Sequence, residues 1–221
     1  MDITPIAYFN SLVKEKFGLP RQAGLAESLR GTVVLEPQFR APEALRGLDG
    51  FDYLWLIWEF HLNRETASEG LTVRPPRLGG NERVGVFASR SPYRPNRLGL
   101  SSVRIESIDA EKGEIHVLGA DLADGTPIYD IKPYVAYADC HPGVRSGFVD
   151  GKEWKPLQVV LPKALFPCFA PDEIDGLFEI LSQDPRPQYQ DDPERIYGLL
   201  YGDRNVKFRV ADGVLTVTEV E

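Results

Sequence analysis

The chain has 221 residues, of which 43% are hydrophobic and 26% are charged. This balance is typical of a folded globular protein and excludes a disordered or fibrous chain. The length allows one main domain of about 100–200 residues and a small second one. The net charge of −8 at pH 7 argues against a nucleic-acid partner unless basic residues cluster, because phosphate binding depends on Lys and Arg.

Arginines do cluster in one stretch of the chain. Seven lie between positions 74 and 104, against the single acid Glu82, so this stretch carries +6 and the rest of the chain −14: Arg74, Arg77, Arg83, Arg90, Arg94, Arg97 and Arg104. Two interpretations stay open. The arginines are ordinary surface charge paired with acids elsewhere, or they form a basic zone that contacts phosphates.

Neither targeting nor cysteine chemistry is indicated. The most apolar run, residues 53–60, is far shorter than the roughly 20 residues that span a bilayer, and no signal-peptide pattern opens the chain. We therefore expect a cytoplasmic protein with no membrane partner. Cys140 and Cys168 lack CxxC spacing and a nearby histidine pair, so we expect reduced thiols, no disulfide and no metal.

Short runs rich in β-branched and aromatic residues, bounded by Gly, Pro and Asn, dominate the first part of the chain. They predict strands over residues 3–8, 31–35, 51–60, 83–88, 103–108 and 114–118. Residues 109–113 supply a turn between the last two. A short helix is predicted over residues 41–46. Many short strands with few helices predict a mainly β fold, an antiparallel β-barrel or a sandwich, over residues 1–162.

The pattern changes near Pro162. Apolar residues recur at helical spacing over residues 165–181, and the Pro-Asp-Glu at 171–173 is typical of a helix start. Three strands follow, with an Asp212-Gly213 turn between the last two, over residues 196–201, 206–210 and 214–220. Residues 163–221 are therefore expected to form a small α+β domain.

The densest group of chemically useful residues lies at positions 85–102. A strand leads into a loop that two prolines stiffen. Arg90, Arg94 and Arg97 place planar donors around this loop, suited to a phosphate, a carboxylate or a base. The alternative is a rigid surface loop with solvated arginines.

A second motif covers residues 124–134. A turn at Asp124-Gly125 precedes a strand whose alternation places Asp130, Lys132 and Tyr134 on one face. These side chains either orient a nucleophile and shift its proton, or form a structural ion pair beside a tyrosine at the core edge.

A third motif is the Gly/Pro loop at residues 17–24, which carries Arg21 and Gln22. On the residues alone it is an exposed loop, and His61 is a satisfied edge histidine. Three aromatic residues are expected in the core: Tyr53, Trp55 and Trp58. The sequence has no GxGxxG after a strand, no Walker loop, no GxSxG and no HExxH, so loops must hold any nucleoside cofactor.

These three loops, together with the Val-Arg-Pro-Pro-Arg-Leu-Gly-Gly at residues 73–80, resemble the TsaA-like, or TrmO-type, tRNA methyltransferases. Residues 183–189 and 205–210 resemble the C-terminal domain of the longer bacterial members. The resemblance implies a non-Rossmann β-barrel that binds S-adenosylmethionine and generally forms a homodimer. It also implies methylation of the exocyclic N6 of threonylcarbamoyladenosine at tRNA position 37, beside the anticodon of threonine tRNA.

The resemblance further implies where the cofactor binds: Pro20, Arg21, Gln22, His61, Leu62, Arg90, Leu100, Asp124, Gly125, Thr126 and Pro127. Asp130, Lys132 and Tyr134 are then expected to orient the ureido group and to help its nitrogen lose a proton. RNA contacts on the anticodon arm are expected from three arginines: Arg94, Arg97 and Arg186. An anticodon loop is a suitable target because its bases are unstacked.

Two other functions stay open from the residues. One is a non-catalytic RNA-binding module that uses the arginine loop, which tight cofactor binding would exclude. The other is an enzyme acting on a phosphorylated small molecule, with Asp130 as base. Strong salt dependence of tRNA binding would count against that second alternative.

Overall fold

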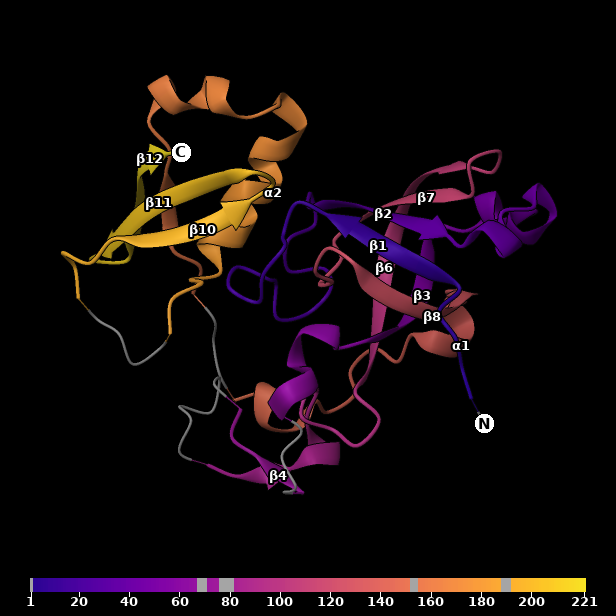
Figure 1. The fold of residues 1–221 in the computed structure, drawn as a ribbon. Helices are drawn as coiled ribbons and strands as arrows, with labels where there is room; N and C mark the ends of the chain where they lie inside the picture. The colour runs from indigo at the N-terminus through magenta and orange to yellow at the C-terminus, as the bar shows by residue number, and fades with distance from the viewer. Residues whose placement is uncertain (1, 67–70, 76–81, 152–154, 188–191) are drawn as a thin grey trace.

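The computed structural model describes residues 2–66, 71–75, 82–151, 155–187 and 192–221. Arg77 and the Gly79-Gly80 pair of the sequence motif lie outside these residues, as do positions 188 and 189. Six antiparallel strands close into a barrel in the order β1-β2-β7-β6-β3-β8 (Figure 1). They are β1 (Ala7–Ser11), β2 (Arg30–Leu35), β3 (Tyr53–Glu59), β6 (Leu98–Asp109), β7 (Glu114–Leu118) and β8 (Thr126–Pro133). The barrel confirms the predicted mainly β fold.

Alternation along the strands fills the barrel. On β3, Leu54 and Leu56 are fully buried and Trp58 is 6% exposed, whereas the residues between them face outward. Equivalent inward positions on the other strands complete one core: Phe9, Val33, Val103, Ile115, Val117 and Ile128. Side chains at every second position therefore exclude water from the barrel, and the outward positions are free to build a site.

The barrel closes through a short pairing and carries a bulge at the closing strand. β1 and β8 pair only from Ala7 to Phe9. Where β8 meets β3, Asp130 pairs with Ile57 and Ile128 with Trp58, so the register shifts between them. Such a bulge bends a strand and re-aims its side chains. It sets the direction of the motif that ends at Tyr134.

Several predicted elements differ in detail from those observed. The first strand begins at Ala7 rather than at residue 3, and the predicted helix at 41–46 is a single 3-10 turn, Pro42–Leu45, that inserts Leu45 into the barrel end. The predicted strand at 83–88 is wrong beyond β5 (Val84–Gly85), which pairs with β4 (Thr72–Val73). The chain then turns into a 3-10 helix, Val86–Ala88, where Phe87 is 75% exposed.

The remaining short elements connect the strands. They are 3-10 helices and one α-helical turn, and they lie between β2 and β3, after β3, after β8 and after the strand Gln158–Val160: Pro37–Phe39, Leu48–Gly50, His61–Thr66, α1 (Ala136–Asp139), Gly147–Val149 and Lys163–Cys168. The α1 turn follows the last barrel strand directly. Its position therefore places Asp139 next to the outer face of β3, where Trp55 donates to it.

A second sheet lies beside the barrel, with strand order β10-β11-β12-β9 and helix α2 packed on it (Figure 1). Its elements are β9 (Gln158–Val160), α2 (Pro171–Ser182), β10 (Tyr197–Tyr201), β11 (Arg204–Ala211) and β12 (Val214–Val220). The predicted helix start and the two-residue Asp212-Gly213 hairpin are confirmed, since both turn residues have positive φ. The predicted domain boundary between residues 162 and 163 stays a prediction. Strand β9, which precedes this boundary in the sequence, pairs with β12, which follows it.

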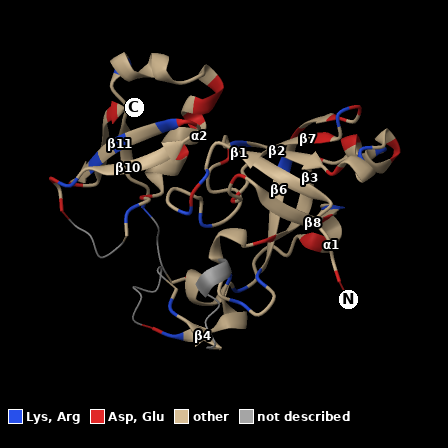
Figure 2. Ribbon diagram, in the orientation of Figure 1, with Lys and Arg blue, Asp and Glu red and all other residues tan. Residues whose placement is uncertain are grey.

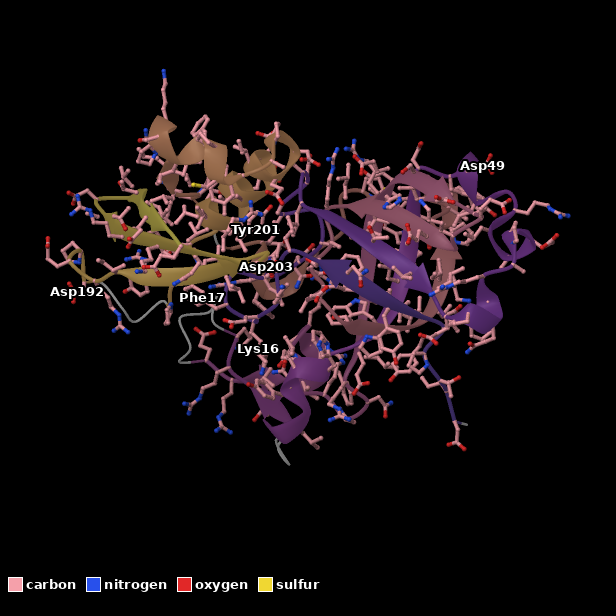
Figure 3. The ribbon with its side chains drawn as sticks, turned by 45° about the horizontal axis from the view of Figure 1, so that its top comes forward. Lys16, Phe17, Asp49, Asp192, Tyr201 and Asp203 are labelled. Carbon is pink, nitrogen blue, oxygen red and sulfur yellow. The ribbon has the colours of Figure 1, made fainter. Side chains whose placement is uncertain are left out.

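The loop between β1 and β2, residues 12–29, lies between the two sheets. Figure 3 labels Lys16 and Phe17 on this loop, and Lys14 of the loop pairs at 2.6 Å with Asp203, in the turn between β10 and β11. Val13 of the loop forms an isolated β-bridge with Tyr201. The loop that carries the third motif thus contacts both parts of the chain.

Among the described residues, no helix is long and apolar enough to cross a membrane. Within the same residues, no group of three or more His, Cys, Asp or Glu side chains is arranged to hold a metal ion.

Candidate active site

A cavity of about 400 Å³ opens on the outer face of the barrel. Three aromatic side chains and several polar ones share its wall: Tyr53, Trp55, Tyr134, Arg90, Ser101, Ser102 and Asp139, with Ala23 and Leu100. The chemical character is that of a ligand site, because flat apolar surface and a few hydrogen-bonding groups converge in one hollow. Three of the sequence-predicted residues, Arg90, Leu100 and Tyr134, meet here.

The aromatic wall corrects part of the predicted core. Trp58 is buried as expected, but Tyr53 is 43% exposed and Trp55 is half-buried, and both line the cavity. The ring centroids of Trp55 and Tyr134 are 5.6 Å apart, and those of Tyr53 and Tyr134 are 6.1 Å apart. The core prediction failed for two residues because the outward positions of β3 are also aromatic.

Asp139 is hydrogen-bonded to this aromatic wall. Its Oδ2 accepts hydrogen bonds from Trp55 Nε1 at 3.0 Å and from the Val135 amide at 2.7 Å. The amide of Val135, and then the Trp55 indole, hold the pKa of Asp139 below its usual range. An ionised carboxylate therefore stands beside the aromatic rings at neutral pH.

Tyr134 behaves in the opposite way. Partial burial raises the pKa of the Tyr134 phenol, and the neighbouring Cys140 and Asp139 raise it further. The phenol is therefore protonated at neutral pH and is suited to donating a hydrogen bond rather than to taking a proton.

A chain of hydrogen bonds leads from the cavity residue Ser101 into the protein. Trp58 Nε1 donates to Ser101 Oγ at 2.9 Å, and Ser101 Oγ donates to Asp121 Oδ1 at 2.5 Å. Burial raises the pKa of Asp121, against the opposing effects of Ser101, the Ala23 amide and the positive charge of Arg90. Asp121 thus links the strand wall to the third motif, although it does not itself line the cavity.

Two of the predicted cofactor loops touch directly. Arg90 Nη1 donates to Gln22 Oε1 at 2.5 Å, and the Gly24 amide donates to the Gly119 carbonyl at 2.8 Å. Pro20 is buried and Arg21 is half-buried on the same loop. The hydrogen bond to Gln22 helps to hold the guanidinium of Arg90 at the cavity wall.

The remaining predicted cofactor residues form a separate group that does not line the cavity. Thr126 Oγ1 and His61 Nδ1 lie 3.3 Å apart, and Asp124 Oδ1 accepts from the Ser11 amide at 2.9 Å. Its other members are Leu62, which is 37% exposed, and Gly125 and Pro127 at the start of β8. The group ties β1 to β8 at the end of the barrel where residues 12–29 begin.

The predicted catalytic trio is divided by the structure. Lys132 Nζ and Asp130 Oδ2 form an ion pair at 2.9 Å on the exposed strand surface, and neither lines the cavity. Tyr134 does line it. The structural ion pair that the spacing left open is therefore present, and the catalytic assignment of Asp130 and Lys132 stays a prediction.

The three predicted RNA contacts are engaged within the protein. Arg94 Nη1 donates to the Ser89 carbonyl at 3.1 Å. Arg97, at φ +46°, lies 3.4 Å from Oε1 of the nearly buried Glu59. Arg186 pairs with its neighbour Asp184 at 2.9 Å. These bonds stabilise the loops that carry the three arginines. Contact with RNA stays a prediction for each of them.

The sequence interpretation gave no role to several residues of the site. Ser101 and Ser102 end the motif at residues 85–102 without a predicted contact, and Asp139, like Asp121 behind the cavity, lies outside the three motifs. The outward alternation of β3 is the one local signal that could have found Tyr53 and Trp55.

Comparison with known proteins decides the family. Residues 8–140 match the tRNA-methyltransferase O N-terminal domain, and residues 175–221 match the TrmO C-terminal domain. The chain belongs to the TrmO family. Among TrmO relatives, the tRNA (adenine(37)-N6)-methyltransferase of Escherichia coli is 38% identical, over 98% of this chain and 96% of its own length.

Two further comparisons support the same family. A protein of Pseudomonas aeruginosa named putative S-adenosylmethionine-dependent methyltransferase RcsF is 42% identical, over 92% of this chain and 90% of its own. The crystal structure of TrmO from Pseudomonas aeruginosa superimposes with a TM-score of 0.80 at 32% identity, covering 100% of this chain and 98% of the other. The TrmO fold therefore extends through both sheets.

Proposed function

We propose that the protein transfers a methyl group from S-adenosylmethionine to N6 of threonylcarbamoyladenosine at position 37 of threonine tRNA, in the cytoplasm and as a homodimer. Membership of the TrmO family makes the chain an S-adenosylmethionine-dependent tRNA (adenine(37)-N6)-methyltransferase. The modified adenosine and the threonine tRNA are the proposed part. The observation that carries the proposal is the meeting of Arg90, Leu100 and Tyr134 at one cavity.

The residues of this cavity fit the cofactor. Flat rings of Tyr53, Trp55 and Tyr134 suit an adenine face, and the guanidinium of Arg90 suits the carboxylate of an amino-acid group. The neighbouring loop, with Pro20, Arg21 and Gln22, would complete the site. We propose that the second group, around His61 and Thr126, contacts the cofactor from the end of the barrel where this loop begins.

S-adenosylmethionine, when bound, supplies a methyl group made electrophilic by its sulfonium. The protein must align the target nitrogen, exclude water and accept the proton that N6 loses. Tyr134, protonated and at the cavity wall, can donate a hydrogen bond to the carbonyl of the ureido group. We propose that Asp130 and Lys132 orient the same group from the strand surface and assist the loss of the proton.

Large exposed apolar residues support the proposed homodimer. Leu71 is 71% exposed, Phe87 75% and Tyr137 92%, and Leu100 of the cavity wall is 56% exposed. Large apolar side chains exposed together commonly mark an interface with another protein surface. A solution mass measurement tests this, and a monomer at assay concentrations would contradict it.

The charge distribution supports tRNA as the substrate. Figure 2 shows Lys and Arg on the loops near β4, whereas α1 and α2 carry acidic residues. We propose that Arg94 and Arg97 face the anticodon arm from this zone. Arg186 would add a contact from the C-terminal part, by which we mean the second sheet, helix α2 and the segments that connect them. Affinity for tRNA should then fall steeply as salt rises.

The experiment is transfer of labelled methyl from S-adenosylmethionine to threonine tRNA prepared with and without the threonylcarbamoyl group. We expect label only in the modified tRNA. Label in both would refute the requirement for the modification, and label in neither, with RNA still bound, would favour a binding module. If Asp130→Asn and Tyr134→Phe both keep near-full turnover with normal tRNA affinity, the proposed catalytic roles fall.

A further inference from the structure

The loop of residues 12–29 packs into the core of the C-terminal part, although it is more than 130 residues away in sequence. Val13, Ala26 and Leu29 belong to the same buried cluster as helix α2 and strands β10–β12. The ring of Phe17, labelled in Figure 3, stacks on Phe208 of β11, with 6.5 Å between centroids. The loop is thus covered on one side by the C-terminal part.

Polar contacts fix the same loop to helix α2. Both carboxylate oxygens of Glu179 accept from Ser28, Oε2 from the backbone amide at 2.7 Å and Oε1 from the hydroxyl at 2.9 Å. At the other end of the loop, the Gly202 amide donates to the Leu12 carbonyl at 2.7 Å. Two charge-assisted bonds from one carboxylate restrain a backbone more strongly than a neutral pair.

Two glycines show how closely the loop and the C-terminal part approach each other. Gly18 of the loop has φ +91°, and a Cβ there would lie 2.1 Å from Leu199 Cδ1 of β10. A Cβ on Gly176 of α2 would lie 3.1 Å from Leu29 Cα. The loop therefore packs closely on this surface at both positions.

The opposite side of the loop faces the cavity. Ala23 lines it, and Gln22 accepts the hydrogen bond from Arg90. Between these residues and Ser28 the loop has neither helix nor long strand to hold it. Its conformation at the cavity must therefore come from what it packs against.

We propose that the C-terminal part positions the cofactor loop, and that Glu179 is a positioning residue for S-adenosylmethionine binding. The inference rests on the proposed function, since it takes residues 20–23 as part of the cofactor site. Ordering a flexible loop costs conformational entropy when a ligand binds, and a loop ordered in advance avoids that cost. Glu179 acts through Ser28 and touches no reacting atom.

The test compares Glu179→Ala with the wild-type protein in two measurements. Calorimetry with S-adenosylmethionine should show at least a fivefold rise in Kd, whereas kcat at saturating cofactor and the Kd for tRNA should stay within twofold. Hydrogen exchange of the backbone amides of residues 18–24 should become faster. Glu179→Gln, which keeps an acceptor oxygen for Ser28, should recover part of both effects.

Lys207→Gln is the matched control, because the ion pairs of Lys207 are with Glu219 and Glu221, which lie outside the loop. It should change neither readout. If Glu179→Ala does not fold, Ser28→Ala removes one of the two bonds and should give the same changes at smaller size.

Normal cofactor affinity and normal exchange in a folded Glu179→Ala variant would overturn the inference. So would a loss confined to tRNA affinity, since that would make the C-terminal part an RNA contact. If wild-type protein does not bind S-adenosylmethionine, the proposed cofactor site fails, whereas exchange at residues 18–24 still reports whether Glu179 orders the loop.

Discussion

Arg90 and Gln22, 68 positions apart in the sequence, are joined by a hydrogen bond of 2.5 Å between Nη1 and Oε1. The bond connects the arginine-rich loop to the loop that lies on the C-terminal sheet. It also fixes the direction of the only guanidinium among the described residues that line the cavity.

If Gln22 orients Arg90 toward a bound carboxylate, the two side chains act as a unit. Arg90→Ala should weaken S-adenosylmethionine binding by about tenfold or more, as expected for a charge-assisted bond. The double variant with Gln22→Ala should lose at least about 0.5 kcal/mol less than the sum of the single losses. Calorimetry on the four proteins measures this coupling, and strict additivity would show that Gln22 does not orient Arg90.

Trp55 should report cofactor binding by fluorescence. Its indole stands between Tyr134 and Asp139 at the cavity wall, so a ligand stacked there changes its surroundings. Trp55→Phe should abolish most of the change in tryptophan emission while an aromatic face remains for binding. A variant that retains the full change on adding S-adenosylmethionine would place the ligand elsewhere.

Arg97 is expected to stabilise the fold whatever it does for RNA. Glu59 is nearly buried and is held by Arg97 and by the Tyr129 hydroxyl, which donates to it at 2.7 Å. Arg97→Ala should lower the free energy of unfolding by about 1–2 kcal/mol, a value reduced for the partial exposure of the pair. Urea unfolding measures it, with Arg97→Lys as the control that keeps the charge.

The two possible roles of Arg97 give different results. Unchanged stability with weaker tRNA binding would assign Arg97 to RNA alone. Lower stability with normal tRNA affinity in the remaining folded protein would leave it a purely structural role.

Stability should depend on pH through Asp121. Burial raises its pKa above the usual 3.8, so the folded state favours the protonated carboxyl. The stability that this provides is complete below pH 3.8 and is lost as pH rises through the raised pKa. Asp121→Asn, which cannot ionise, should therefore gain stability relative to wild type between pH 4 and pH 7 in urea unfolding.

Asp109 is a control of opposite sign. The Lys112 ammonium, followed by the Lys112 amide, lowers the pKa of Asp109, so its contribution is present at neutral pH and is lost as the solution is acidified. Asp109→Asn should be less stable than wild type at neutral pH, and this difference should shrink as the pH falls below 3.8. Parallel pH curves for wild type and Asp121→Asn would show that Asp121 is not desolvated in the folded protein.

Local signals in the sequence predicted the local structure. The Asp212-Gly213 pair specifies a two-residue hairpin because both residues tolerate positive φ, and the strand around Val117 follows its own alternation. By contrast, the strand expected to continue past Gly85 lacks a partner for Phe87, and only the three-dimensional arrangement reveals that. Pairing partners decide where a strand ends.

The site was less predictable because distant segments assemble it. The motifs point to Arg90 and Tyr134, but Ser101 of β6 and Asp139 of α1 acquire a role only when the fold brings both elements against β3 at one cavity. The spacing of Asp130 and Lys132 is equally compatible with an ion pair and with catalysis, and the strand surface shows the ion pair. Sequence spacing describes what can meet, whereas topology determines what does.

The contact between Ser28 and Glu179 spans 151 positions, which has a consequence for the order of events during synthesis. The ribosome releases the loop early and helix α2 late, and contacts between distant segments form slowly. A nascent chain can close its barrel once β8 has emerged, since β1 and β8 complete it. We expect the ability to hold the cofactor tightly to arise only after the last strands have folded, so that incomplete chains stay catalytically silent.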